Sequence, residues 1–165
     1  MLYGCRLPCL LVLACALGGC RGKAPYEGKS AAQLERMLHD PNPSVQAQGA
    51  FGLSRIGPEA HSALPTLVES LQSPESLVRQ NAALALGQIG PEAGDAVPAL
   101  TAALRDREWA VRRQAALALG LIGPASRVAI PALTKLRQDP SKVVRRAAQD
   151  ALDKIRQGEP EKKRL

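Results

Sequence analysis

The stretch VRRQAALALGLIGP, residues 111–124, indicates the fold of this chain, because a close copy, VRQNAALALGQIGP, stands 33 residues earlier at 78–91. Apolar residues such as Val78, Ala82 and Ala85 recur at intervals of four and three, the spacing of one helix face rather than the alternation of a strand. The closing Gly-Pro ends a helix, since glycine accepts the left-handed conformation and proline cannot extend the hydrogen-bonded ladder. The stretch therefore predicts the longer helix of a repeated unit.

The same step of 33 residues runs through most of the chain. It connects Ile56, Ile89, Ile122 and Ile155; Leu34, Leu67, Leu100 and Leu133; and Val45, Val78, Val111 and Val144. Prolines 65, 98 and 131 share the step and suit the first turn of a shorter helix. We therefore predict an all-α fold, an armadillo-like α-solenoid of four 33-residue helix pairs, each a short helix A, a turn and a longer helix B.

The end of the array differs from its middle in polarity. Asp150, Asp153 and Lys154 stand where an inner unit has Leu84, Gly87 and Gln88. Inner B helices are apolar nearly all round and need a neighbour on both sides, whereas a terminal unit needs a polar outer face. The fourth unit is therefore predicted to cap the stack.

The N-terminus has a separate pattern. Arg6 precedes an apolar stretch, residues 7–19, that is too short to span a bilayer as a helix and ends in small residues. Leu17, Gly19 and Cys20 resemble the lipobox of a bacterial lipoprotein signal peptide, which implies cleavage before Cys20 and its lipidation. The alternative is an ordinary leader with a chance cysteine, which would leave the protein soluble and secreted.

These patterns divide the chain into four parts. They are a signal peptide at 1–19, the lipidated Cys20 with a flexible linker at 20–29, the solenoid at 30–157 and a disordered charged tail at 158–165. Several acyl chains on Cys20 would anchor the protein stably to a membrane. The expected location is the bacterial cell envelope, on the outer membrane of a two-membrane bacterium, since Arg21 is not the aspartate associated with inner-membrane retention.

The Gly-Pro turns and the Val-Arg pairs at 78–79, 111–112 and 144–145 resemble those of HEAT repeat proteins, nearest to the phycobilisome-lyase-like type. The resemblance implies a curved stack whose B helices line an inner surface that binds other macromolecules. It also implies that Arg112 and Arg145, each six residues after an aspartate (Asp106 and Asp139), join a ladder between adjacent units.

No catalytic residue, cofactor or metal ligand is expected. A related HEAT enzyme, deoxyhypusine hydroxylase, holds two irons with His-Glu pairs. The corresponding pairs here are Ala47-Gln48, Gln80-Asn81, Arg113-Gln114 and Arg146-Ala147. His39 and His61 have no second imidazole at ligand spacing, and all four cysteines, Cys5, Cys9, Cys15 and Cys20, precede the repeats.

Four residues are candidates for partner binding: Trp109, Arg113, Lys142 and Arg146. Trp109 is the only tryptophan, and it either anchors a partner or fills a gap between units. The three cations form either an electropositive ridge for an acidic partner or a solvated face. Residues 99–165 hold 15 basic and 7 acidic side chains within a chain of net charge +7, so the positive charge lies in the second half.

The sequence thus predicts a noncatalytic, lipid-anchored scaffold that binds an unidentified protein partner in the bacterial envelope, an acidic one if the three cations form an electropositive ridge. One alternative is a phycobilin-lyase-like enzyme or enzyme subunit, which the few aromatic residues and the lack of a free thiol in the mature chain disfavour. Another is an electrostatic binder of anionic envelope polymers or headgroups. Nucleic acid is not an expected partner, because the chain carries an export signal.

Overall fold

The computed structural model describes residues 24–157, so the expected signal peptide, Cys20 and the tail at 158–165 lie outside the described residues. The short A helices are α1 (Ala31–Leu38), α3 (Leu64–Ser70), α5 (Val97–Ala103) and α7 (Ile130–Leu136). The long B helices are α2 (Pro43–Ile56), α4 (Ser76–Ile89), α6 (Trp109–Ile122) and α8 (Lys142–Gln157). Three 3₁₀ segments join the units: η1 (Gly57–Ala63), η2 (Gly90–Ala96) and η3 (Gly123–Ala129).

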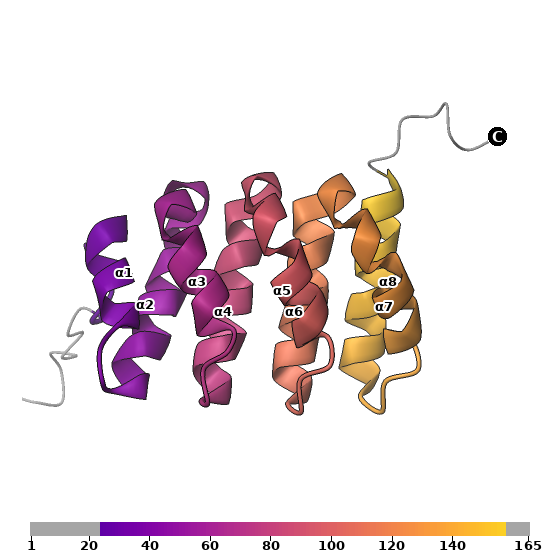
Figure 1. Ribbon diagram of the computed structural model, residues 1–165, viewed down its shortest axis with the longest axis horizontal. Helices are drawn as coiled ribbons and strands as arrows, with labels where there is room; N and C mark the ends of the chain where they lie inside the picture. Colours follow the sequence, from indigo (N-terminus) through magenta and orange to yellow (C-terminus); the bar gives the residue numbers. More distant parts are fainter. Residues whose placement is uncertain (1–23, 158–165) are drawn as a thin grey trace, which may run out of the picture.

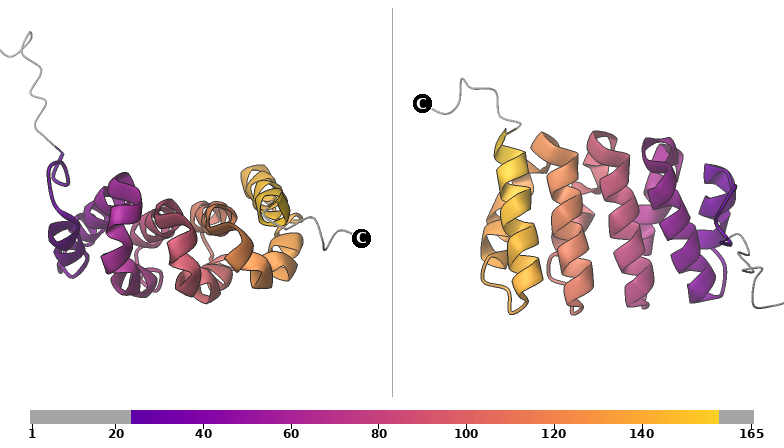
Figure 2. Two further views of the ribbon diagram at one scale, coloured as in Figure 1. Left: turned by 90° about the horizontal axis from the view of Figure 1, so that it is seen from above. Right: turned by 180° about the vertical axis from the view of Figure 1, so that it is seen from behind.

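The helices form two rows. The A helices stand in front in Figure 1, and the B helices form one continuous row when the molecule is seen from behind (Figure 2, right). Seen from above, the B row spans the shorter side of the stack, so it lines the inner side of a shallow arc (Figure 2, left). The predicted all-α solenoid of four helix pairs is confirmed.

The Gly-Pro turns take the predicted left-handed form. Gly57, Gly90 and Gly123 have φ of 65°, 79° and 75° at the ends of their B helices. Each proline then opens a 3₁₀ segment that leads directly into the next A helix. The sequence predicted a simple turn here, whereas the structure has 3₁₀ segments of seven residues, in which Ala60 and Ala93 are fully buried.

Small residues bring the B helices close together. A methyl group added at Gly87 would lie 2.9 Å from Cα of Ala118, and one added at Gly120 would lie 2.9 Å from Cα of Ala151. Between the two rows, Leu67, Leu100 and Leu133 are fully buried and form part of the core. Burial of each such side chain stabilises the fold by about 2 kcal/mol, and this burial is complete only when the units are stacked.

The first unit begins at the predicted residue, and the segment before it also packs against the stack. Ser30 forms the expected capping box, with Gln33 N–H donating to Ser30 Oγ at 3.4 Å and Ser30 N–H donating to Gln33 Oε1 at 2.9 Å. Residues 24–29, however, were assigned to the flexible linker, and Tyr26 instead packs edge to face on Phe51 with ring centroids 5.1 Å apart. Tyr26 also covers Gly52, so it closes the N-terminal end of the stack.

The last unit has the expected polar edge. One face of α8 is buried, including Val144, Leu152 and Ile155, while Asp150 and Lys154 are exposed. The stretch Trp109–Leu136 is apolar and long enough by composition to span a membrane. It is divided between α6, η3 and α7, and half of its most apolar window is buried against neighbouring helices, which is the pattern of a core.

Candidate functional site

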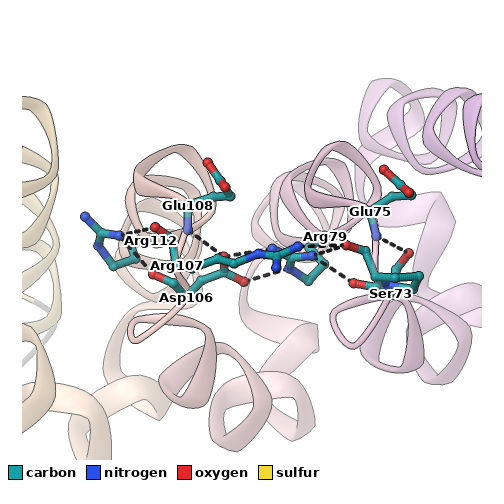
Figure 3. Close-up of polar contacts among 8 residues, drawn as sticks. Ser73, Glu75, Arg79, Asp106, Arg107, Glu108 and Arg112 are labelled. Atoms are coloured by element: carbon teal, nitrogen blue, oxygen red, sulfur yellow. Dashed lines mark hydrogen bonds and ion pairs between the residues drawn. The ribbon is translucent and has the colours of Figure 1, made fainter.

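Two arginine–aspartate pairs join adjacent units at the start of the B helices. Arg79 donates from Nε and Nη2 to the two carboxylate oxygens of Asp106 at 2.7 and 2.9 Å, as Figure 3 shows. Arg112 binds Asp139 in the same way at 2.7 and 3.0 Å. Each pair connects the B helix of one unit to the turn of the next unit, so the structure contains a ladder that includes the expected Arg112.

Each ladder arginine is also held by main-chain oxygens of its own unit. Nη1 of Arg79 donates to the carbonyls of Ser73 and Pro74, both at 2.9 Å, and Nη1 of Arg112 donates to those of Asp106 and Arg107. The carboxylates are fixed as well, because Asp106 accepts a bond from the Glu108 N–H at 2.8 Å. These groups leave the guanidinium little freedom.

The pairs are nearly buried, with exposed side-chain fractions of 8% for Arg79 and 11% for Asp106. Burial alone would raise the pKa of Asp106, but the hydrogen bonds from Arg79 and from Glu108 N–H, with the charge of Arg79, lower it overall. The hydrogen bond from Arg112 is the main cause of the lowered pKa of Asp139, against a smaller opposing effect of burial. Both carboxylates are therefore ionised at neutral pH, and the ladder is a structural element.

The ladder stops at both ends of the array. In the first unit Gln46 replaces arginine and Ser73 replaces the aspartate it would meet, so both charges are lost together. In the last unit Arg145 keeps its main-chain bonds, from Nη1 to the carbonyls of Asp139 and Pro140 at 2.8 and 3.1 Å. No carboxylate of residues 24–157 reaches it, so Arg145 does not tie two units together as expected.

The four candidate partner-binding residues lie on the first turns of two neighbouring B helices. Trp109 and Lys142 open α6 and α8, and Arg113 and Arg146 follow one turn later at matching positions. Trp109 is 51% exposed and does not belong to the core, so it does not fill a gap between units. The three cations are exposed and have no ion pair within the described part of the chain. We call these four residues the C-terminal patch.

The sequence did not predict a pocket that lies on the B row. It measures about 340 Å³ and lies between α2 and α4, lined mainly by Phe51, Leu77, Tyr26 and Ala47, with Asn81 at its side. Asn81 donates to the carbonyl of Ala47 at 2.9 Å across the two helices. The available signal was that Phe51 puts an aromatic ring where the inner units have Leu84 and Leu117. The role of Tyr26 lacked such a signal, because it precedes the first unit.

Other candidate chemistry is sparse. His61 lies 3.9 Å from Glu92, and both side chains are more than half exposed, which is a surface contact. Within residues 24–157 no three side chains of His, Cys, Asp or Glu are grouped so that they could hold a metal ion.

Comparison with known proteins gives one family. A model described as HEAT repeats matches residues 31–95 and 91–153, which is more than half of the chain. Comparison with curated proteins found no match.

Solved structures agree with the fold. An engineered protein is 30% identical, with 78% of this chain and 63% of that chain covered and a TM-score of 0.66. Human deoxyhypusine hydroxylase in complex with glycerol is 34% identical, with 79% and 45% covered and a TM-score of 0.60. A designed armadillo repeat protein in complex with the peptide (KR)4 is 21% identical, with 76% and 64% covered and a TM-score of 0.67.

The chain spans less than two thirds of the length of each of these structures. Its stacked helix pairs form a repeat scaffold suited to protein binding. On the stack and the family match together, this chain belongs to the HEAT repeat family.

Proposed function

We propose that this protein is a noncatalytic, lipid-anchored scaffold that binds a protein partner along the B row in the bacterial envelope. The observation that carries the proposal is the position of its exposed apolar side chains. Of the five large apolar side chains that are exposed within residues 24–157, four lie on B helices: Leu77, Trp109, Leu121 and Val143. Exposed apolar residues with polar residues around them are typical of interaction surfaces.

The charge of the row favours an acidic partner. Residues 99–157 carry 12 basic and 5 acidic side chains, and residues 24–98 carry 4 basic and 8 acidic. Arg113, Lys142 and Arg146 flank Trp109 and have no acidic partner among the described residues. An aromatic anchor beside unpaired cations is the combination that recognises a segment with both apolar and acidic side chains.

The fold is compatible with this mode of binding. The designed armadillo repeat protein that holds the peptide (KR)4 shares the stacked-helix architecture.

The anchor is proposed from Cys20 and the lipobox resemblance. Cys20 precedes Tyr26, which closes the first unit, by six residues. At about 3.5 Å per extended residue, such an anchor would hold the N-terminal end of the stack within about 20 Å of the membrane.

The binding test is crosslinking in the native envelope followed by quantitation of each captured partner with variants. We expect Trp109→Ala and Arg113→Ala to weaken capture at least fivefold each. The matched controls are Val128→Ala on η3 and Arg137→Ala just after α7, which are exposed but lie off the B row. Equal loss for controls and B-row variants, or no loss for any of them, would exclude this surface.

The anchor is tested separately. Intact mass of the membrane fraction should show a chain that begins at Cys20 and carries acyl groups, and Cys20→Ser should release the protein from membranes. An unlipidated mature chain in the wild type would contradict the anchor but would leave the scaffold unaffected. Binding to anionic polymers is the competing outcome, and it would be recognised by capture that disappears with salt and is insensitive to Trp109→Ala.

A further inference from the structure

The ladder provides an internal template for reading Arg145. In both complete pairs, Nη1 of the arginine donates to two main-chain carbonyls, and Nε and Nη2 form a fork that receives one carboxylate at 2.7–3.0 Å. The carbonyls fix the orientation of the guanidinium, because its five N–H groups lie in one rigid plane. Nε and Nη2 are therefore directed toward the next unit before any carboxylate arrives.

Arg145 has the first half of this arrangement and lacks the second. Its Nη1 donates to Asp139 and Pro140 carbonyls at 2.8 and 3.1 Å, matching the 2.8 and 3.1 Å bonds of Arg112. Among residues 24–157, no acceptor pairs with its Nε or Nη2. Its side chain is only partly buried, so a carboxylate from outside can reach the fork.

A further helix pair is a poor candidate for the source of that carboxylate. Inner units approach each other at Gly87 and Gly120, where a methyl group would already lie 2.9 Å from the next helix. Asp153 takes this position in α8, and its carboxylate accepts a bond from Gln149 at 3.0 Å. Stacking of a second copy is also hindered at the other end, because Tyr26 covers Gly52. An extended segment avoids both obstacles.

We infer that the open fork of Arg145 binds an aspartate or glutamate carboxylate from an extended acidic segment of the protein partner. Arg146 and Lys142 belong to the same end of α8 and raise the local concentration of such a segment. The site extends the C-terminal patch beyond the sequence candidates, and it rests on the proposed partner-binding function. A bidentate, charge-assisted pair adds geometric selection to the attraction that any cation would supply.

The test follows the side-chain Nε–Hε signals of arginine by NMR in the ¹⁵N-labelled protein. The probe is a blocked tetra-aspartate peptide, and the matched control peptide is tetra-asparagine. We expect the Arg145 signal to shift and saturate with tetra-aspartate, toward the positions of the Arg79 and Arg112 signals, and to stay unmoved with tetra-asparagine. No shift, or the same shift with both peptides, would overturn the inference.

A variant separates the fork from simple charge. Arg145→Lys keeps the positive charge and removes the planar fork, so we expect about tenfold weaker binding of tetra-aspartate, as loss of a charged hydrogen bond predicts. Lys142→Gln, which removes a charge and leaves the fork intact, should weaken binding less. Equal effects of the two variants would reduce the site to general electrostatics and overturn the inference. Thermal unfolding of each variant checks that the fold is retained.

Two further outcomes are distinguishable. If the protein self-associates in sedimentation velocity and Asp40→Asn abolishes this, a second copy supplies the carboxylate, and the extended-segment inference fails. Asp40 is relevant because it stands at the ladder position of the first unit, with its carboxylate accepting from Asn42 N–H at 2.8 Å. If Arg145→Lys leaves capture of the envelope partner unchanged while Trp109→Ala abolishes it, the Arg145 site fails and the proposed function stands.

Discussion

At the scale of single residues, Ser126 has an unused hydroxyl in the core. It is fully buried, and its Oγ has no hydrogen-bond partner in the described structure. The equivalent positions hold Ala60 and Ala93, which are equally buried. Because an unsatisfied buried hydroxyl costs about 1–3 kcal/mol, we expect Ser126→Ala to stabilise the protein by about 1 kcal/mol in denaturant unfolding. The reverse change, Ala93→Ser, should destabilise the protein. An Ala93→Ser variant as stable as the wild type would show that the buried hydroxyl carries no such cost.

The ladder makes stability depend on pH at the level of its aspartates. The pKa values of Asp106 and Asp139 are lowered from the ordinary value of 3.8 by their arginine partners, so the folded state binds protons less readily than the unfolded chain. Their contribution is fully present above the ordinary aspartate pKa and is lost as the pH falls through the lower native values.

We therefore expect Asp106→Asn to cost about 3 kcal/mol near pH 6, because it leaves Arg79 nearly buried without a counter-charge. This difference from the wild type should shrink when urea unfolding is repeated at pH values progressively further below the ordinary aspartate pKa of 3.8, as the wild-type carboxylates become protonated. A difference that stays constant across this range would show that the lost ion pair is not its cause.

Single residues also mark how far the sequence could predict the ladder. Asp106 and Arg112 were found through their spacing of six, but each arginine binds the aspartate of the following unit, 27 residues ahead. Spacing within a unit therefore identified Arg112 and both aspartates but not the pairing, and it missed Arg79, which follows Ser73 rather than an aspartate by six residues. The end effects needed the structure, because only geometry shows that Arg145 keeps its carbonyl bonds without a carboxylate.

At the scale of elements, the glycines of the B helices set the distance between units. A methyl group at Gly87 would lie 2.9 and 3.1 Å from Cα and Cβ of Ala118, and the backbone there cannot yield cheaply. We expect Gly87→Ala to destabilise the protein by about 2 kcal/mol, despite the better helix propensity of alanine. The matched control is Gly94→Ala in η2, where the nearest atom is Ala125 Cβ at 3.8 Å.

That control should be neutral or stabilising by about 0.5 kcal/mol, since alanine restricts the unfolded chain. Equal loss of stability in both variants would indicate that close packing does not govern the spacing between B helices.

The sequence predicted the elements because the helix period, the Gly-Pro helix ends and the prolines at helix starts all recur at one step of 33 residues. It could not predict the 3₁₀ form of the connectors, because the backbone after Gly-Pro is decided by where the next A helix packs.

At the scale of the whole molecule, the repeats predicted the scaffold and said little about its surface. Trp109 and its neighbouring cations were identifiable as departures from the repeat, and the structure places them together on the B row. The pocket at Phe51 and Leu77 could not be predicted from the sequence, because it depends on Tyr26 packing against Phe51 of the first unit. Features that arise between units or at the ends of the array need coordinates, whereas features carried within one unit can be read from its period.

The stability of the array should depend on contacts between each unit and its nearest neighbours. Each inner B helix is covered by the B helices before and after it. Removing α7 and α8 therefore exposes the side of α6 around Gly120, which packs against Ala151, and also removes the polar edge that α8 supplies. We expect a chain that ends at residue 129 to unfold at a clearly lower guanidinium concentration, with a shallower transition, and to associate through the uncovered face. The control ends at residue 157 and keeps all eight α-helices, so its midpoint should match that of the full chain. An equal midpoint for the shorter chain would mean that each unit is stable alone, which would remove the physical basis of the stack.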